Sequence, residues 1–497
     1  GHGLSMVTLC YMRRYVHFLS SLLAGADGNF TLSKEVARWL TETAAALERL
    51  HGELPDEPAV GALRHRALAE LGEAASRYRE AVYRQDGFSG QDQVAAKEVA
   101  RLLEHGLAVI DHSIRVNRRS DGLFHSYNLV VLGTDSIETE HLYPMLEGQV
   151  AALSSGIIAP EDAARLLAKL FDSDLYRPDQ HSFLLYPDRE LPGFLEKNRI
   201  PPEAVSALPI LGRMISEGDE RLILRDAEGC YRFSAEFRNA RDLDAEIDRL
   251  VPDYGDELET ARARLRQLYE TVFHHHAFTG RSGTMFAFEG LGSIYWHMVA
   301  KLLLAAQENY FAAVDQGSGP DLCRRLGELY YRIRAGIGFN KGPAEYGAFP
   351  TDPYSHTPGH AGAQQPGMTG QVKEEILTRF GELGVRVRDG IARFQPGLLR
   401  AKEFTPAARA FHYVDVSGTW QELELPAGTL AFTWCQVAVM YRLDDAAEPL
   451  LRVCYDDDTE RCLDGAELPP EDSAELFGRS GRIRRIEFTF PRGWLFA

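Results

Sequence analysis

Apolar residues recur at helical spacing from Gly3 to about Phe380. Residues 34–54 place an apolar side chain at every third or fourth position, and 95–114, 293–313 and 321–337 repeat this pattern. It predicts about a dozen helices, many joined by short turns that contain Gly or Pro. Nothing returns at a fixed short period, so a regular solenoid is disfavoured.

The chain opens with an apolar stretch over residues 3–25. Arg13 and Arg14 interrupt it, which argues against a membrane-spanning helix, and no cleavage site of a signal peptide follows. We expect a core helix that begins almost at the first residue. Such an opening also suggests a fragment from which an N-terminal domain is missing.

After Gly384 the pattern changes to alternation of apolar and polar residues, rich in Val, Phe, Tyr and Thr. Asp389-Gly390 and Ala427-Gly428 stand where turns between strands are expected. The pattern predicts two domains: a helical catalytic domain over 1–383 and a C-terminal antiparallel β-sandwich over 384–497.

Composition limits the possible partners. The 497 residues carry a net charge of -18, which argues against nucleic acid as a partner and suits a neutral or cationic ligand. An anion would need a local site that escapes the overall field. The six cysteines are scattered without CxxC spacing, which favours a reducing compartment, and we expect a cytoplasmic protein.

Four long polar segments interrupt the helical pattern: 117–139, 172–199, 278–292 and 340–370. Long structured loops in a compact domain are usually functional. In a toroid of paired helices, loops at one end gather around the central axis, so these segments could line one cleft.

The first segment contains Asp121, His125 and Tyr127. Asp121 either caps its own Asp-Gly turn or serves as a general acid at the floor of a cleft. In the second segment, Asp179 and Gln180 lie among aromatic residues that include Tyr186. Rings and planar polar groups together suit a sugar, although such aromatics also anchor a loop to its helices.

The third segment carries three adjacent histidines, 274–276, which point in different directions on a helix. We therefore expect no metal site. Arg281 is a candidate substrate ligand, and Glu289 precedes a helix with Tyr295 and His297. Glu289 either caps that helix or binds a ligand hydroxyl.

The fourth segment includes 354–370, which contains no Asp, Glu, Lys or Arg. His356 and His360 lie within it, and Glu345 precedes it. Thr369–Gly370 leads directly into a helix, where free N–H groups and a hydroxyl form either an anion site or an ordinary N-cap.

The order of these segments resembles the cellobiose-phosphorylase-like family of glycoside phosphorylases with (α/α)6 barrels. "EGLGSIYWH", Glu289 to His297, is similar to that family's Glu-Asn-Gly-Gly-x-Tyr-x-His motif, with one residue more. "GMTGQVKEEILTRFGELGVRVRDGIARFQPGLL" is similar to its phosphate loop, last barrel helix and short strands. "LYPMLEGQVAALSSGIIAPEDAARLL" is similar to the barrel helix after its catalytic segment.

The resemblance implies a mainly α fold, with an (α/α)6-type toroid before the β-sandwich. It implies that His297, Thr369 and Gly370 lie near bound phosphate and Glu289 near the sugar. The family's Trp-Asn-Asp catalytic motif is missing, and Gln371 replaces the Trp of its phosphate loop. The family's N-terminal β-sandwich is missing as well.

We therefore predict an enzyme that cleaves a glycosidic bond of an oligosaccharide by general acid catalysis, either by hydrolysis or by phosphorolysis. Asp121 is the first candidate for the acid and Asp179 the second, and Glu289 is a base or a sugar ligand. No cofactor is expected, and inorganic phosphate is a possible co-substrate. The predicted substrate-binding residues are His125, Tyr127, Gln180, Tyr186, Arg281, Tyr295, Glu345, His356 and His360.

Two other functions remain open. A polysaccharide lyase would use His125 with Tyr127 as the base, although the negative net charge disfavours a polyanionic substrate. A non-catalytic glycan-binding or scaffold protein is consistent with the missing Trp-Asn-Asp motif.

Overall fold

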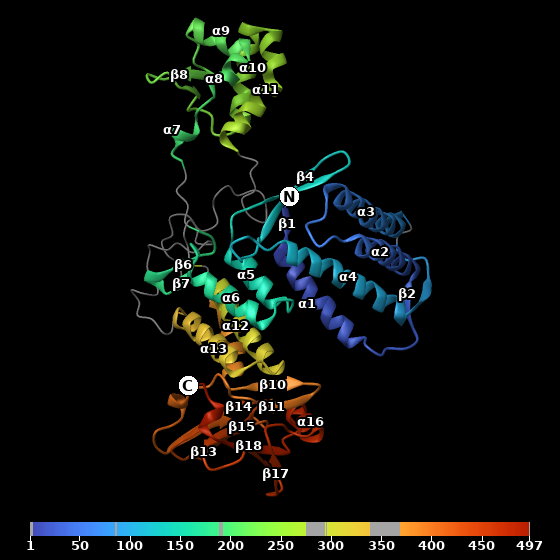
Figure 1. Cartoon of the computed structure of the whole chain (residues 1–497), viewed down its shortest axis with the longest axis vertical. Coiled ribbons are helices and arrows are strands. Elements are labelled where there is room, and N and C mark those ends of the chain that lie inside the picture. Colours follow the sequence, from blue (N-terminus) through green and yellow to red (C-terminus); the bar gives the residue numbers. More distant parts are fainter. Residues whose placement is uncertain are drawn as a thin grey trace.

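The computed structural model describes residues 3–84, 87–187, 192–274, 294, 296–337 and 368–496 (Figure 1). Helices predominate before residue 383, and small sheets and hairpins follow. The main helices are α1 (Met6–Leu22), α2 (Lys34–Glu53), α3 (Gly61–Arg84), α4 (Ala96–Val116), α5 (Leu146–Ser154), α6 (Pro160–Phe171), α12 (Trp296–Asp315), α13 (Pro320–Ala335) and α15 (Met368–Glu382).

The helices predicted from spacing are confirmed at α2, α4, α12 and α13. The closed (α/α)6 ring stays a prediction. The described helices include the antiparallel neighbours α12 and α13, and α12 also packs against α5, α6 and α15. Because α12 packs against four other helices, its position in the fold is well fixed.

Short strands within the helical part were not predicted. β1 (Gly3–Ser5) precedes α1 and pairs with β4 (Tyr127–Leu132), which pairs with β5 (Ile137–His141). The expected core helix near the start of the chain is confirmed as α1, which begins at Met6 directly after β1. β2 (Asn29–Ser33) pairs with β3 (Gln91–Ala95), and β6 (Tyr176–Arg177) with β7 (Ser182–Phe183).

Residues 194–273 form a lobe with its own hydrophobic core, which Figure 1 shows apart from the other helices. Leu211, Met214, Leu222, Leu243 and Leu250 are fully buried within it. Its elements are α7 (Phe194–Lys197), α8 (Pro202–Ser206), α9 (Pro209–Glu217), β8 (Ile223–Arg225), β9 (Tyr231–Phe233), α10 (Ala240–Tyr254) and α11 (Asp256–Phe273).

The C-terminal part contains two hairpins and a five-stranded sheet. The hairpins pair β10 (Val385–Arg388) with β11 (Ile391–Phe394) and β12 (Arg409–Val414) with β13 (Trp420–Leu425). The sheet has the order β14-β15-β18-β16-β17. Its strands are β14 (Thr429–Trp434), β15 (Val437–Leu443), β16 (Leu450–Tyr455), β17 (Glu460–Asp464) and β18 (Ile483–Phe490).

The expected purely antiparallel arrangement is wrong for one pair, since β15 and β18 are parallel. β18 lies between β15 and β16 and is antiparallel to β16. A strand inserted between two antiparallel neighbours must be parallel to one of them, and α16 (Pro470–Gly478) provides the connection before β18. The sandwich itself stays a prediction.

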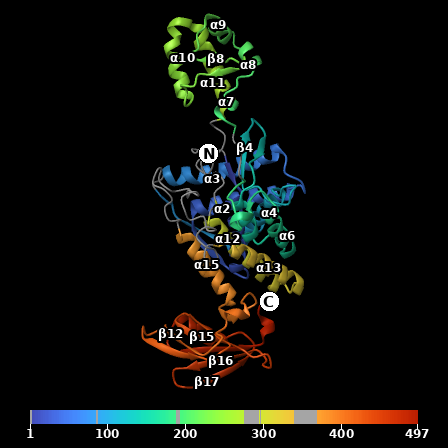
Figure 2. The same cartoon turned by 90° about the vertical axis from the view of Figure 1, so that its left-hand side faces the viewer.

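The helical part and the C-terminal part meet where α15 ends at Glu382 and β10 begins at Val385. Figure 2 shows α15 leading into the C-terminal strands. The division into domains 1–383 and 384–497 stays a prediction. Among the described residues, no helix is long and apolar enough to cross a membrane.

Candidate functional site

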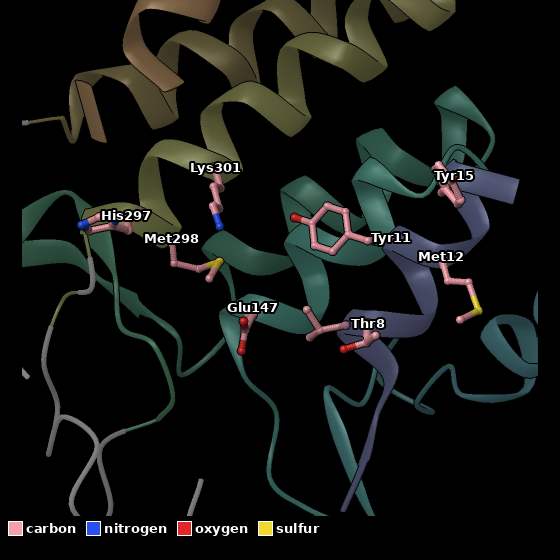
Figure 3. Close-up of a pocket in the computed structure, with 9 residues that line it drawn as sticks. Thr8, Tyr11, Met12, Tyr15, Glu147, His297, Met298 and Lys301 are labelled. Carbon is pink, nitrogen blue, oxygen red and sulfur yellow. The ribbon is translucent and has the colours of Figure 1, made fainter. Parts of the chain in front are cut away.

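A pocket of about 580 Å³ lies between α1, α5 and α12 (Figure 3). The lining combines polar and apolar side chains, which is typical of a ligand site; α1 and α12 contribute both kinds, and α5 contributes Glu147. The lining residues are Val7, Thr8, Tyr11, Met12, Tyr15, Glu147, His297, Met298 and Lys301.

His297 and Lys301 supply the basic side of the pocket. They are four residues apart on α12, so their side chains leave the same face of the helix, one turn from each other. The neighbouring residues Val299 and Leu302 are fully buried and fix that face in place. Figure 3 shows the ammonium group of Lys301 directed into the pocket. Lys301 forms no ion pair with any described residue.

Glu147 supplies the acidic side, in the first turn of α5. A carboxylate is favourable there because the helix dipole is positive at this end. The hydroxyl of Tyr127 donates a hydrogen bond of 2.6 Å to Glu147 Oε2. Tyr127 is buried in β4, and its hydrogen bond orients a carboxylate of the pocket; its predicted role as a substrate ligand stays a prediction.

Tyr11 of α1 lies on the other side of Lys301 and Glu147 from His297 in Figure 3. Burial raises the pKa of its phenol, and the nearby carboxylates Glu308 and Glu147 raise it further. The phenol therefore stays protonated at neutral pH and can donate a hydrogen bond to a ligand.

The start of α15 lies at the same end of the molecule as His297. Asp315, the last residue of α12, pairs with Arg386 of β10 at 2.6 Å, and α15 runs directly into β10. Both helices thus end at the C-terminal part and run parallel. Thr369 and Gly370 in the first turn of α15 consequently lie toward the beginning of α12.

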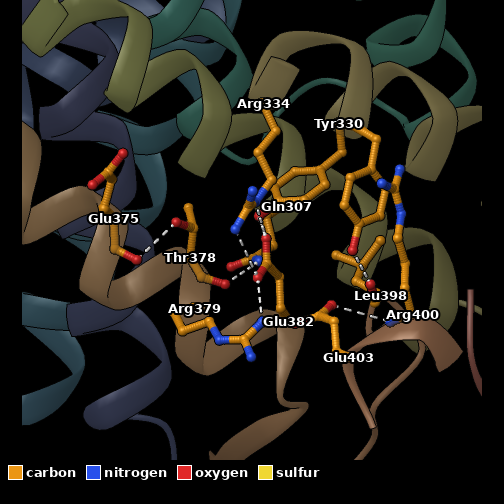
Figure 4. Close-up of polar contacts among 11 residues, drawn as sticks. Gln307, Tyr330, Arg334, Glu375, Thr378, Arg379, Glu382, Leu398, Arg400 and Glu403 are labelled. Atoms are coloured by element: carbon orange, nitrogen blue, oxygen red, sulfur yellow. Dashed lines mark hydrogen bonds and ion pairs between the residues drawn. The ribbon is translucent and has the colours of Figure 1, made fainter. Parts of the chain in front are cut away.

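A buried ionic junction holds α15 against α13 (Figure 4). Glu382 is 1% exposed and accepts hydrogen bonds from Tyr330 Oη at 2.7 Å and Arg379 Nη1 at 2.8 Å. Arg334 also donates to Glu382. These partners satisfy the buried carboxylate and set the position of α15.

α12 is joined to α15 just beside this junction. Gln307 Nε2 donates to Thr378 O at 2.7 Å. A Cβ at Gly381 would lie 2.0 Å from Gln307 Oε1, so glycine permits this close contact between the helices.

Asp121, the first candidate for the general acid, lies in a tight turn. Arg119 donates to its carboxylate at 2.8 Å, and the backbone N–H of Leu123 donates at 3.1 Å. The hydrogen bond from Arg119 is the main cause that lowers the pKa of Asp121. A general acid needs the opposite shift, so this geometry disfavours that role, which stays a prediction.

His125 stacks on His141 with ring centroids 3.8 Å apart. Burial, and then the charges of His141 and Arg119, lower the pKa of His125 to about 4. The imidazole is therefore neutral at physiological pH. Neither His125 nor Asp121 lines the pocket.

The second polar segment also lies outside the pocket lining. Asp179 is in the short helix η1 (Pro178–Gln180), its side chain is 61% exposed, and it pairs with Arg177 at 3.1 Å. Gln180 is buried. Tyr186 is buried edge-on against Tyr143, with ring centroids 5.5 Å apart, as expected for an anchored loop.

Several predicted residues fall outside the described part of the chain, and the roles predicted for them stay predictions. For Thr369 and Gly370 the structure gives the helical backbone only. The residues outside the described part are Arg281, Glu289, Tyr295, Glu345, His356 and His360.

One group of possible metal ligands occurs among the described residues, formed by Asp226, Glu228 and Cys230 in the lobe. Asp226 already pairs with Arg232 at 2.6 Å and accepts the backbone N–H groups of Glu228 and Cys230. These contacts account for the cluster as a stabilised turn.

Residues 191–276 match the family model of the GH149 phosphorylase insertion domain 2. No curated protein matches the sequence. The matched range coincides with the lobe, whose core is separate from that of the pocket helices. The match supports a relationship to GH149-type glycoside phosphorylases, and hence to carbohydrate-active enzymes. The cellobiose-phosphorylase-like barrel is not confirmed by it.

Among the predicted residues whose side chains the structure describes, His297 is the one that lines the pocket between α1, α5 and α12. Sequence reasoning missed Lys301, Glu147 and Tyr11. Lys301 could have been found because it is one helical turn after His297. Glu147 gave no such local signal, since its role depends on how α5 crosses α12.

Proposed function

We propose that the chain belongs to a glycoside phosphorylase and that the pocket between α1, α5 and α12 holds phosphate and the adjoining sugar. The observation that carries this proposal is the basic face formed by His297 and Lys301 inside a pocket that also contains Glu147. The match of residues 191–276 to a phosphorylase domain points to the same reaction class.

The electrostatics of the pocket suit an anion within an acidic protein. The net charge of -18 repels phosphate at long range, but Lys301 provides a local positive charge without a competing ion pair in the described residues. α12 and α15 both begin at this end, and helix N-termini attract anions. We assign Thr369 and Gly370 to the same phosphate site on this basis.

In phosphorolysis an oxygen of phosphate attacks the anomeric carbon of the terminal sugar. The glycosidic C–O bond breaks, and the leaving oxygen takes a proton from a carboxylic acid. The products are a sugar 1-phosphate and an oligosaccharide shortened by one unit. The ion pair with Arg119 counts against Asp121 as this acid, and the ion pair of the exposed Asp179 with Arg177 counts against Asp179 in the same way; both assignments stay predictions.

Glu147 and Tyr11 are assigned to the sugar. The hydrogen bond from Tyr127 keeps the Glu147 carboxylate in one orientation, in which it accepts hydrogen bonds from sugar hydroxyls. Tyr11 offers a phenolic donor on the opposite helix.

The test is an oligosaccharide panel incubated with the protein in the presence and absence of inorganic phosphate. We expect sugar 1-phosphate that appears only with phosphate. Free sugar formed without phosphate would indicate a hydrolase instead, and an unsaturated uronate would indicate a lyase. Binding without any turnover would favour a glycan-binding protein.

A further inference from the structure

We propose that a second cavity binds a small uncharged molecule with an apolar body and a hydroxyl group, such as a phenol. This cavity has a volume of about 360 Å³ and lies between α1, α2, α3 and α4, next to β5. It shares no lining residue with the pocket between α1, α5 and α12. The inference therefore goes beyond the proposed function and does not rest on it.

Most of the wall of this cavity is apolar. Leu9 of α1, Leu50 of α2, Leu63 and Ala67 of α3 and Val109 of α4 all line it. An apolar cavity of about 150 Å³ already accommodates benzene, so the larger space here has room for an aromatic ring with substituents. Burial of such a ring against these side chains supplies the affinity.

One end of the cavity is polar, and a chain of hydrogen bonds fixes the state of His141 there. Asn117 Nδ2 donates to the carbonyl of His125 at 2.6 Å, so Asn117 Oδ1 is left to accept from Asn128 Nδ2 at 3.0 Å. Asn128 Oδ1 consequently faces His141 Nδ1 at 2.8 Å. Because an amide oxygen accepts, Nδ1 carries the proton and Nε2 of His141 is left as an acceptor.

His112 of α4 provides a second acceptor in the same lining. Its Nε2 lies 2.8 Å from the carbonyl oxygen of Pro55, which can only accept. Nε2 therefore donates, and Nδ1 of the neutral ring is an acceptor. Neither His112 Nδ1 nor His141 Nε2 receives a hydrogen bond from the described residues. Two acceptors without donors select a ligand that brings its own donor.

The charges around the cavity favour a hydroxyl over an amine or a carboxylate. No Asp or Glu occurs among the described residues that line it, so an ammonium group would lack a counter-charge. Arg64 lines it, but its Nη1 already donates to Ile137 O at 3.3 Å and lies 3.9 Å from Glu138 Oε2. Burial, and then the charges of Arg119 and Arg64, lower the pKa of His141, so its ring is neutral at physiological pH. A carboxylate has no proton to donate to neutral imidazoles.

The test compares small ligands of one shape. p-Cresol, 4-methylanisole, 4-methylbenzoate and 4-methylbenzylamine are titrated into the intact protein by calorimetry. We expect p-cresol to bind about 5–10-fold more tightly than 4-methylanisole, which lacks the donor, as expected for the loss of one hydrogen bond. The anion and the cation should bind more weakly than p-cresol.

Two variants that fill the cavity test its position. Ala67→Phe on α3 and Ser113→Leu on α4 each place a larger side chain in the lining and should abolish binding of p-cresol. Ala69→Phe is the matched control, because Ala69 is exposed on the same helix as Ala67 and does not line the cavity. Urea unfolding identifies the variants that fold. Binding of p-cresol that survives in a folded filling variant overturns the proposed site.

Two further variants test the selection of a hydroxyl. His112→Leu and His141→Leu each remove one acceptor, and p-cresol should lose its advantage over 4-methylanisole in at least one of them. A preference that survives in both variants, or no preference in the wild type, overturns the inference. Tightest binding of 4-methylbenzoate also overturns it, because Arg64 would then select the ligand.

Discussion

The pocket and the ionic junction both lie beside α12, but they differ in whether their charged side chains have ion-pair partners. At the junction Glu382 is enclosed and satisfied by Tyr330, Arg334 and Arg379 (Figure 4). In the pocket, the ammonium group of Lys301 points into the cavity and has no ion-pair partner among the described residues. The paired charges of the junction therefore stabilise the packing of α15 against α13, whereas the positive charge of Lys301 is available for a ligand.

The largest effect on stability is expected from Glu382→Ala. The change leaves two arginines and a tyrosine hydroxyl without their buried acceptor, which should cost about 3–5 kcal/mol. The free energy of unfolding in urea measures it. Asp321→Ala is the control, because this carboxylate is 91% exposed in its pair with Arg324 and should contribute less than about 1 kcal/mol. Equal losses in both variants would contradict the supporting role of the junction.

Glu375 lies on the same helix as Glu382, but its carboxyl lacks the hydrogen-bond and ion-pair partners that Glu382 has. Burial raises its pKa above the ordinary value of 4.5, against the opposing charge of Arg334, and its Oε1 is buried without a hydrogen bond. The folded state therefore holds this proton more tightly than the unfolded state. Its contribution is fully present below about pH 4.5 and is lost as pH rises through the folded pKa.

We expect Glu375→Gln to be more stable than the wild type at pH 7, with the difference vanishing near pH 4. Urea unfolding at the two pH values measures this. Glu328→Gln, at an exposed site on α13, should show no such pH-dependent gain. A destabilised Glu375→Gln at pH 7 would show that the carboxylate is paired after all.

A smaller effect is expected in the β4 hairpin, at His125. Its pKa of about 4 lies below the ordinary 6.5, so its contribution to stability is present above pH 6.5 and is lost as pH falls toward 4. NMR titration of the imidazole should show a neutral ring at pH 5.5. In His141→Asn the pKa of His125 should rise, because one of its causes is removed. A His125 that titrates near 6.5 would contradict the buried, stacked arrangement.

Local periodicity was sufficient for much of the fold. Residues 321–337 show helical spacing strongly enough to predict α13, and Asp389-Gly390 marks the turn of the β10-β11 hairpin. The sequence pattern did not predict β1, because this strand has only three residues and pairs with a strand more than a hundred positions away. The sequence pattern did not predict the lobe as a separate unit. Its helices have the same hydrophobic period as those of the main core, and only the packing shows that the two cores are distinct.

The site was less predictable for a similar reason. His297 was identified from its motif, but Glu147 and Tyr11 become neighbours of Lys301 only through the crossing of three helices. The polar composition of the Asp121 segment suggested a site. In the structure, an Asp-Gly turn and the ion pair between Asp121 and Arg119 account for that composition.

The most direct test of the account is phosphate affinity at Lys301. Calorimetric titration of inorganic phosphate should show saturable binding to the wild type and about 10–100-fold weaker binding to Lys301→Met, as expected for loss of a charged hydrogen bond. Lys97→Met, at an exposed position of α4, should bind like the wild type. Equal affinity of the Lys301 and Lys97 variants would contradict the proposed phosphate site.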